Sequence, residues 1–306
     1  MEFISDYEAR HQKRITRIPD DLSFAGEPVH FKSADAYQKF YRELKLNTAN
    51  NASTRLLLSN ARIWLPQISQ ILQAHKLPED FVYVVVAESN LSNAVSPKGA
   101  AGFWQLTAVT ASELGLEVND EVDERYHPIK ATYAACKYFK RSYKIFGNWT
   151  ATAASYNRGM NGLQRAFRNQ SVNSYYDLAL NDETSRYIYR ILALKDLIKN
   201  PEKYGLKKVK GTAPAMRKIK VDTTIHDLRQ FAEAIKVPYD ILKSSNPWLL
   251  KNTLTIKEAG KVYVLQVPKY IPQRAIATDK PVSTDTSDVL SSKELDRLKS
   301  VLKSSG

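Results

Sequence analysis

The chain has 306 residues, of which 43% are hydrophobic and 25% are charged, and its formal net charge is +13 at pH 7. This length and composition predict an ordinary soluble globular protein with one sizeable core and a smaller module. They exclude a transmembrane helix, because no run of about 18 apolar residues occurs.

Helical periodicity begins after an N-terminal arm at residues 1–30, where charges mix with proline and glycine and we expect an extended or loosely packed chain. Apolar residues then recur at three- and four-residue steps, which predicts amphipathic helices over residues 34–46 and 53–76. Pro78 is expected to begin the next helix, which carries the apolar run at residues 81–87.

The helical pattern continues to about residue 205, and β-structure is nearly absent before it. Further helices are predicted over residues 103–114, 128–146, 150–156, 162–168 and 182–198. Cys136 is the single cysteine and lies among aromatic residues at helical spacing, so we expect a buried structural thiol and no intrachain disulfide. The five histidines are scattered without ligand spacing, so we expect no metal site and no cofactor.

The composition changes after residue 205. A basic, glycine-containing stretch is followed by a pattern that predicts strand, helix, helix and strand at residues 218–221, 225–235, 238–243 and 262–267. Serine, threonine, lysine and aspartate dominate the C-terminal end, which predicts disorder. We therefore expect five parts: an N-terminal arm at 1–30, a helical catalytic domain at 31–205, a linker at 206–217, a small module at 218–270 and a disordered tail at 271–306.

Glu88 directly follows the apolar run at residues 81–87, at the edge of a segment that should be buried. Partial removal from water disfavours the charged form, so the pKa of this carboxyl should rise and let it act as a general acid near neutral pH. A glycine-containing loop with Trp104 and Gln105 follows, and Trp104 is interpretable either as a core residue or as a sugar platform. A helix-end glutamate whose carboxylate reaches solvent is the alternative interpretation of Glu88.

Three separated segments carry a resemblance to a known family. Within residues 88–105 the chain reads Glu-Ser, Ala-x-Ser and Gly-Ala-x-Gly-Phe-Trp-Gln; residues 154–159 read Ala-Ser-Tyr-Asn-Arg-Gly, and residues 183–187 read Glu-Thr-Ser-Arg-Tyr. In this order they resemble the signature of the soluble-lytic-transglycosylase-type catalytic domain, in particular its membrane-bound lytic murein transglycosylase D branch. The resemblance covers roughly residues 50–205 and implies a mainly α, lysozyme-like (goose-type) fold.

The resemblance implies cleavage of the β-1,4 bond between N-acetylmuramic acid and N-acetylglucosamine, with formation of 1,6-anhydromuramic acid and Glu88 as the single general acid and base. Most glycoside hydrolases use a second carboxylate. We assign none here, because Asp123 and Glu124 are interpreted as a salt-bridge and capping cluster and Glu183 as the start of a helix.

The resemblance also assigns supporting roles to five residues, namely Ser96, Gln105, Tyr156, Asn157 and Tyr187. Tyr187 is expected to hydrogen-bond Glu88 and set its orientation. Tyr156 and Asn157 are expected to hold the N-acetyl group or stabilise developing charge, and the other two to hydrogen-bond the sugar or Glu88. Arg158 replaces the usual alanine of its motif, and we expect it to bind a stem-peptide carboxylate.

The module at residues 218–270 resembles a lysin-motif (LysM) carbohydrate-binding module, because an Asn-Pro pair and a Val-Pro ending follow its two helices. Residues 222–225 read Asp-Thr-Thr-Ile where Gly-Asp-Thr-Leu is usual. Glycan binding by this module and packing against the catalytic domain therefore both stay open as its role.

The net charge of +13 is compatible with binding to an anionic cell-wall polymer, to anionic lipid headgroups or to nucleic acid. The alternative interpretation is a charged surface that serves only solubility. No nucleic-acid-binding motif accompanies the lysines, so we expect peptidoglycan glycan strands as the partner and no nucleic acid. Two competing functions stay open: a hydrolytic muramidase on the same fold, and a non-catalytic peptidoglycan-binding protein. The family implies a periplasmic or cell-envelope location; residues 1–6 show no signal-peptide pattern, and membrane association through a leader or lipid anchor stays open.

Overall fold

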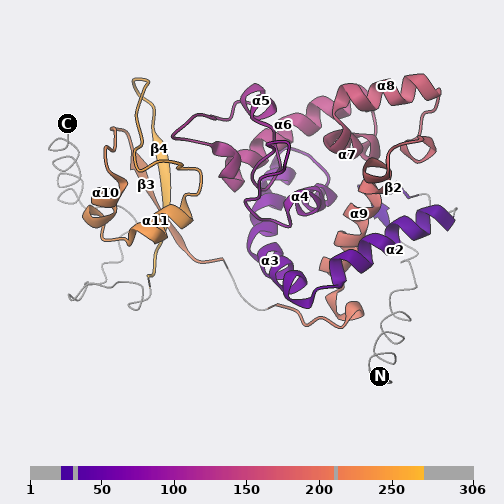
Figure 1. Ribbon diagram of the computed structural model, residues 1–306, viewed down its shortest axis with the longest axis horizontal. Coiled ribbons are helices and arrows are strands. Elements are labelled where there is room, and N and C mark those ends of the chain that lie inside the picture. Colours follow the sequence, from indigo (N-terminus) through magenta and orange to yellow (C-terminus); the bar gives the residue numbers. More distant parts are fainter. Residues whose placement is uncertain (1–21, 30–33, 210–212, 272–306) are drawn as a thin grey trace. The chain divides into compact units, whose positions relative to one another are not determined.

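The computed structural model describes residues 22–29, 34–209 and 213–271 (Figure 1). Most of the predicted N-terminal arm and almost all of the predicted tail at 271–306 therefore lie outside the described residues. The chain divides into two compact units: Met1–Gly115 with Pro128–Thr212, and Leu116–His127 with Ala213–Gly306. No helix among the described residues combines the length and the apolar character needed to cross a membrane.

The first unit is helical, as its periodicity predicts. Its α-helices are α2 (Ala34–Thr48), α3 (Asn51–Ala74), α4 (Val82–Ser89), α5 (Ala108–Glu113), α6 (Pro128–Phe146), α7 (Trp149–Arg158), α8 (Met160–Gln170) and α9 (Asp182–Lys199). Short 3-10 turns lie at η1 (Glu79–Phe81), η3 (Tyr175–Asp177) and η4 (Pro201–Tyr204). The mainly α, lysozyme-like fold class is thereby confirmed.

Helix α4 lies in the interior of this unit and packs against α3 and α9 (Figure 1). Its residues Val84, Val85 and Val86 have no exposed surface. Each buried aliphatic side chain contributes about 1.5–3 kcal/mol relative to an exposed one, so this helix is held firmly along its length. The rings of Phe81 and Phe139 meet at its N-terminal end with centroids 4.6 Å apart.

The prediction of a helix over residues 103–114 is wrong for its first five residues. Gly102 and Gln105 adopt positive φ angles of 77° and 47°, which a right-handed helix cannot contain. Thr107 caps α5 by accepting a hydrogen bond from the backbone N–H of Thr110 at 3.2 Å, so the helix begins only at Ala108. The residues before it form a loop beside the end of α4.

The expectation of a loosely packed arm is wrong for residues 23–28. They form a two-stranded hairpin, β1 (Ser23–Phe24) and β2 (Glu27–Pro28), and Phe24 is completely buried. The Glu27 carboxylate accepts hydrogen bonds from the backbone N–H groups of Trp149 (2.6 Å) and Thr150 (2.8 Å). A carboxylate is stabilised at this positive end of α7. The hairpin is therefore held by the burial of Phe24 and by the hydrogen bonds of Glu27.

The second unit contains the predicted order of strand, helix, helix and strand. Its elements are β3 (Met216–Val221), α10 (Leu228–Ala234), α11 (Tyr239–Ser245) and β4 (Tyr263–Pro268). The strands pair antiparallel, with Ile219 opposite Leu265. Both residues are buried with Phe231 and Trp248 in one core.

The segment Leu116–His127, which connects α5 and α6, belongs to the second unit. Val122 is 1% exposed and pairs with Leu249, and the 3-10 turn η2 (Glu124–Tyr126) follows it. The Glu117 carboxylate accepts hydrogen bonds from Lys261 Nζ (2.7 Å) and Tyr263 Oη (2.9 Å). The predicted boundaries at 31–205 and 218–270 did not anticipate this contribution.

Candidate active site

Glu88 lies in the last turn of α4, which ends because Asn90 adopts a left-handed conformation with φ of 52°. The hydrophobic residues of α4 hold the helix in the core, while its end brings Glu88 to a half-buried position. The Tyr187 hydroxyl, which comes from the buried face of α9, donates a hydrogen bond to the Glu88 carboxylate. The structure thus brings together the two residues for which a direct contact was expected.

Burial raises the pKa of Glu88 from 4.5 to about 7, and this confirms the expected elevation. The Tyr187 hydrogen bond and the positive charge of Arg190 favour the carboxylate and act against that rise. The negative charge of Glu183 acts with it. A carboxyl group with this pKa is present in both protonation states near neutral pH, as a residue that both donates and accepts a proton requires.

The buried Tyr187 and the half-buried Tyr156 lie beside Glu88 and stay protonated. Burial, followed by the charge of Glu88, raises the pKa of both Tyr156 and Tyr187 well above its usual value. Tyr156 Oη donates to the backbone oxygen of Trp104 at 2.6 Å. Trp104 itself is completely buried and donates from Nε1 to Thr132 Oγ1 at 2.9 Å, so it is a core residue and not a sugar platform.

Asn157, at the end of α7, is held by the first turn of α9. Its Nδ2 donates to Glu183 Oε1 at 3.1 Å, and its Oδ1 accepts from Thr184 Oγ1 at 3.0 Å. One acceptor and one donor on α9 therefore determine the orientation of this amide. The interpretation of Glu183 as the start of a helix is correct. Its contact with Asn157 and its effect on the pKa of Glu88 were not predicted from the sequence. The Glu-Thr pair of the third motif was the signal that could have predicted the contact with Asn157.

Ser96 and Gln105 shape the loop between α4 and α5. Ser96 Oγ accepts a hydrogen bond from Ala100 N at 3.0 Å, and Gln105 Nε2 donates to the backbone oxygens of Ala94 (2.9 Å) and Gly102 (2.8 Å). The hydrogen bonds described for these two side chains all stay within the loop. Their predicted roles toward the sugar or Glu88 stay predictions.

Asp123 and Cys136 are structural, as expected. Asp123 and Arg125 form an ion pair at 2.7 Å, and Asp123 caps η2. Cys136 is completely buried, and burial raises the pKa of its thiol to about 12, so it is not a nucleophile. In the described ranges of the chain, no three His, Cys, Asp or Glu side chains are grouped to hold a metal ion.

Comparison with known families agrees with this geometry. Residues 67–178, which include Glu88, Tyr156 and Asn157, match the model of the transglycosylase SLT domain. The chain contains a transglycosylase SLT domain. Residues 217–270 match the soluble lytic transglycosylase C-terminal LysM-like domain. Tyr187 lies beyond the matched SLT residues, and its hydrogen bond to Glu88 is seen in the structure.

Two groups of curated relatives are similar to the chain. The membrane-bound lytic murein transglycosylase D of Escherichia coli, in strain K12 and equally in strain CFT073, is 25% identical over 263 residues, covering 84% of this chain. A putative tributyltin chloride resistance protein of Alteromonas is 29% identical over 113 residues, covering 36% of this chain and 55% of that protein. The chain spans 56% of the length of the murein transglycosylases.

Proposed function

We propose that this protein is a peptidoglycan lytic transglycosylase. The observation that carries the proposal is Glu88, a half-buried carboxyl with a pKa of about 7 that receives a hydrogen bond from Tyr187 within an SLT domain. The bond cleaved is the β-1,4 linkage between N-acetylmuramic acid and N-acetylglucosamine. The LysM-like domain and the similarity to murein transglycosylases support the same substrate.

In the first step, the protonated Glu88 donates its proton to the glycosidic oxygen, and the bond to the muramic acid carbon breaks. In the second step, the 6-hydroxyl of that same sugar attacks the oxocarbenium-like carbon, and the Glu88 carboxylate takes up the hydroxyl proton. A 1,6-anhydro sugar forms, Glu88 is protonated again and no water is consumed. An intramolecular nucleophile needs no second carboxylate to activate water, since its proximity alone lowers the barrier.

The surrounding residues support these steps. Tyr187 donates to Glu88 and so stabilises the carboxylate that exists between the two steps. Asn157 keeps one N–H and one lone pair beyond its two contacts with α9, and these can bind the N-acetyl group. The hydrogen bonds of Ser96 and Gln105 order the loop, and Tyr156 keeps its hydroxyl beside the charge of Glu88. We propose these roles together with the reaction.

A hydrolytic muramidase is the second candidate, and one observation favours it. Glu183 is an exposed carboxylate whose charge acts on Glu88. As a base for water it would supply the second carboxylate that most glycoside hydrolases use. Its contact with Asn157 Nδ2 gives it a structural role instead, so we place the lytic reaction first.

We also propose that the protein acts in the cell envelope, where peptidoglycan lies. The similarity to a protein named membrane-bound supports an envelope location, and association of this chain with the membrane is a further proposal.

The test is mass spectrometry of the fragments that purified sacculi release on incubation with the protein. We expect anhydro-ended fragments from the wild type and none from Glu88→Gln, while Glu113→Gln, which changes an exposed glutamate of α5, should behave like the wild type. Fragments with reducing ends, heavier by one water, would support the muramidase and assign a role to Glu183. Sacculi that bind the protein but release nothing would leave a binding protein.

A further inference from the structure

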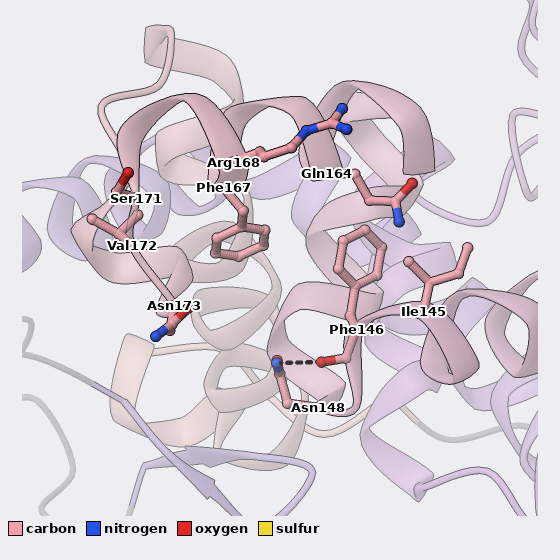
Figure 2. A pocket seen from close by; sticks show the side chains of 9 residues that line it. All are labelled: Ile145, Phe146, Asn148, Gln164, Phe167, Arg168, Ser171, Val172 and Asn173. Atoms are coloured by element: carbon pink, nitrogen blue, oxygen red, sulfur yellow. Dashed lines mark hydrogen bonds between the residues drawn. The ribbon is translucent and has the colours of Figure 1, made fainter.

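A pocket with a volume of ≈ 560 Å³ lies in the first unit, away from Glu88. Its walls are the end of α6, the turn at Asn148, helix α8 and the turn that follows α8 (Figure 2). This volume is in the range of pockets that bind small ligands. Asn148 caps the beginning of α7, whereas Tyr156 lies near its end, so the rise of the helix separates the pocket from the Glu88 site by roughly 12 Å.

The floor of the pocket is apolar and its rim is polar. Phe146 and Phe167 face each other with ring centroids 6.1 Å apart, and Ile145 beside them is 40% exposed (Figure 2). Gln164 and Arg168, both exposed, project from α8 at the rim. Such a lining offers alkyl groups an apolar surface and offers a carboxylate the hydrogen-bond donors of a guanidinium and an amide.

One wall is formed by an ordered turn. Ser171 ends α8 in a left-handed conformation with φ of 51°, and the Val172 N–H donates to the Phe167 oxygen at 3.4 Å. Asn148 Nδ2 donates to the Phe146 oxygen at 3.1 Å, and its Oδ1 accepts from Ala151 N at 2.8 Å. The backbone on both sides of the two phenylalanine rings is therefore held in place without a ligand.

The helices that line the pocket belong to a stretch of sequence whose charged residues are all basic, and Arg168 lines the pocket itself. Residues 128–176, which span α6, α7 and α8, contain eight lysines and arginines and no aspartate or glutamate. Two glutamates from other elements contact this region: the N–H groups at the start of α7 donate to the Glu27 carboxylate, and Asn157 Nδ2 at the end of α7 donates to Glu183 Oε1. Such a concentration of positive charge attracts an anionic ligand and disfavours a neutral or cationic one.

We propose that this pocket binds the carboxylate-bearing peptide stem of peptidoglycan, an inference that rests on the proposed function. The stem combines carboxylates, which match Arg168, with short alkyl side chains, which match the apolar floor. A naked glycan strand is also anionic, but it lacks the stem's alkyl side chains, which the apolar floor would contact. A peptide held here would anchor a strand next to the one being cut, since the pocket and Glu88 lie at opposite ends of α7.

The test is isothermal titration calorimetry of the full chain with a synthetic stem peptide, L-Ala-γ-D-Glu-meso-diaminopimelyl-D-Ala. We expect saturable binding that Arg168→Ala weakens about tenfold or more, because a charge-assisted hydrogen bond is lost. Arg165→Ala is the matched control: it removes the same charge from an exposed position of α8 that does not line the pocket, and it should change the affinity less than twofold.

Equal weakening by the two variants would overturn the proposal, because it would reveal attraction to the basic surface alone. Absence of saturable binding to the wild type would also overturn it. Binding to phosphatidylglycerol vesicles that depends on Arg168, without peptide binding, would assign the pocket to lipid headgroups. The peptide contains no glycosidic bond, so the two proposals can fail separately. Cleavage of sacculi without peptide binding would refute the proposed role of the pocket alone. Peptide binding without cleavage of sacculi would refute the proposed reaction alone.

Discussion

Tyr187→Phe removes the hydroxyl that donates to Glu88 and keeps the buried ring. Because that hydrogen bond favours the carboxylate, its loss favours the protonated acid and raises the pKa of Glu88 above its value of about 7. A hydrogen bond to a charged group contributes about 1.5–3 kcal/mol, and one pKa unit corresponds to about 1.36 kcal/mol. The pKa of Glu88 in the variant should therefore reach roughly 8 to 9.

The assay is the pH dependence of kcat/KM for the release of anhydro-ended fragments from sacculi. Glu88 must be protonated to begin the reaction, so the wild-type rate should fall as the pH rises through about 7. In Tyr187→Phe this alkaline limb should move upward by roughly one to two pH units, while the maximal rate falls roughly tenfold because the carboxylate loses a partner. Tyr189→Phe, which removes a hydroxyl from the same helix, should leave the profile unchanged. An alkaline limb that stays in place or moves to lower pH would refute the reasoning.

Three further changes test other parts of the structure. Glu88→Gln should stabilise the fold at alkaline pH. The pKa of Glu88 is about 7 in the folded state and 4.5 ordinarily, so the wild type loses stability as the pH rises from about 4.5 through about 7. At pH 8 the variant should be more stable by roughly 2–3 kcal/mol, visible as a higher Tm that is absent at pH 4. Glu183→Gln keeps the oxygen that accepts from Asn157 but removes a negative charge that raises the pKa of Glu88. The alkaline limb of the rate profile should therefore move to lower pH, the opposite of its shift in Tyr187→Phe. A move to higher pH would contradict the effect of Glu183 on the pKa of Glu88. Phe24→Ala should lower the free energy of unfolding by about 3–5 kcal/mol in denaturant titrations, and a loss below about 1 kcal/mol would show that the hairpin is not part of the core.

Local pattern was enough to predict most of the helices and the residue at the centre of the site. The bounds of α6 agree with its apolar period, with the proline at its first position and with the glycine that follows it. The apolar run before Glu88 predicted both a buried helix and an elevated pKa, since one cause, burial, produces both. Motif order then predicted that Tyr187, far along the chain, reaches Glu88.

The features that were missed depend on specific hydrogen bonds that a periodic apolar pattern does not encode. Residues 103–107 contain helix-forming types, but Gln105 adopts a positive φ angle and its side chain hydrogen-bonds the backbone of the loop. The hairpin at 23–28 has little apolar pattern of its own and is held by the start of α7 and by Lys195, which donates to the Ser23 oxygen at 2.7 Å. For the hairpin, no period within a short segment carries such information, because the stabilising groups lie more than a hundred residues away.

The inclusion of Leu116–His127 in the second unit affects how the chain can fold during synthesis. This segment leaves the ribosome long before β4, whose residue Tyr263 donates to Glu117 and whose unit buries Val122. Synthesis at about 5–20 residues per second makes the interval between Val122 and β4 on the order of ten seconds. During this time Val122 has no partner to bury it. The first unit can acquire its helices in that time, but the loop between α5 and α6 reaches its final conformation only after translation has passed the second unit. If the chain were cut once between the units, the two pieces would stay assembled, because both contribute residues to the core of the second unit.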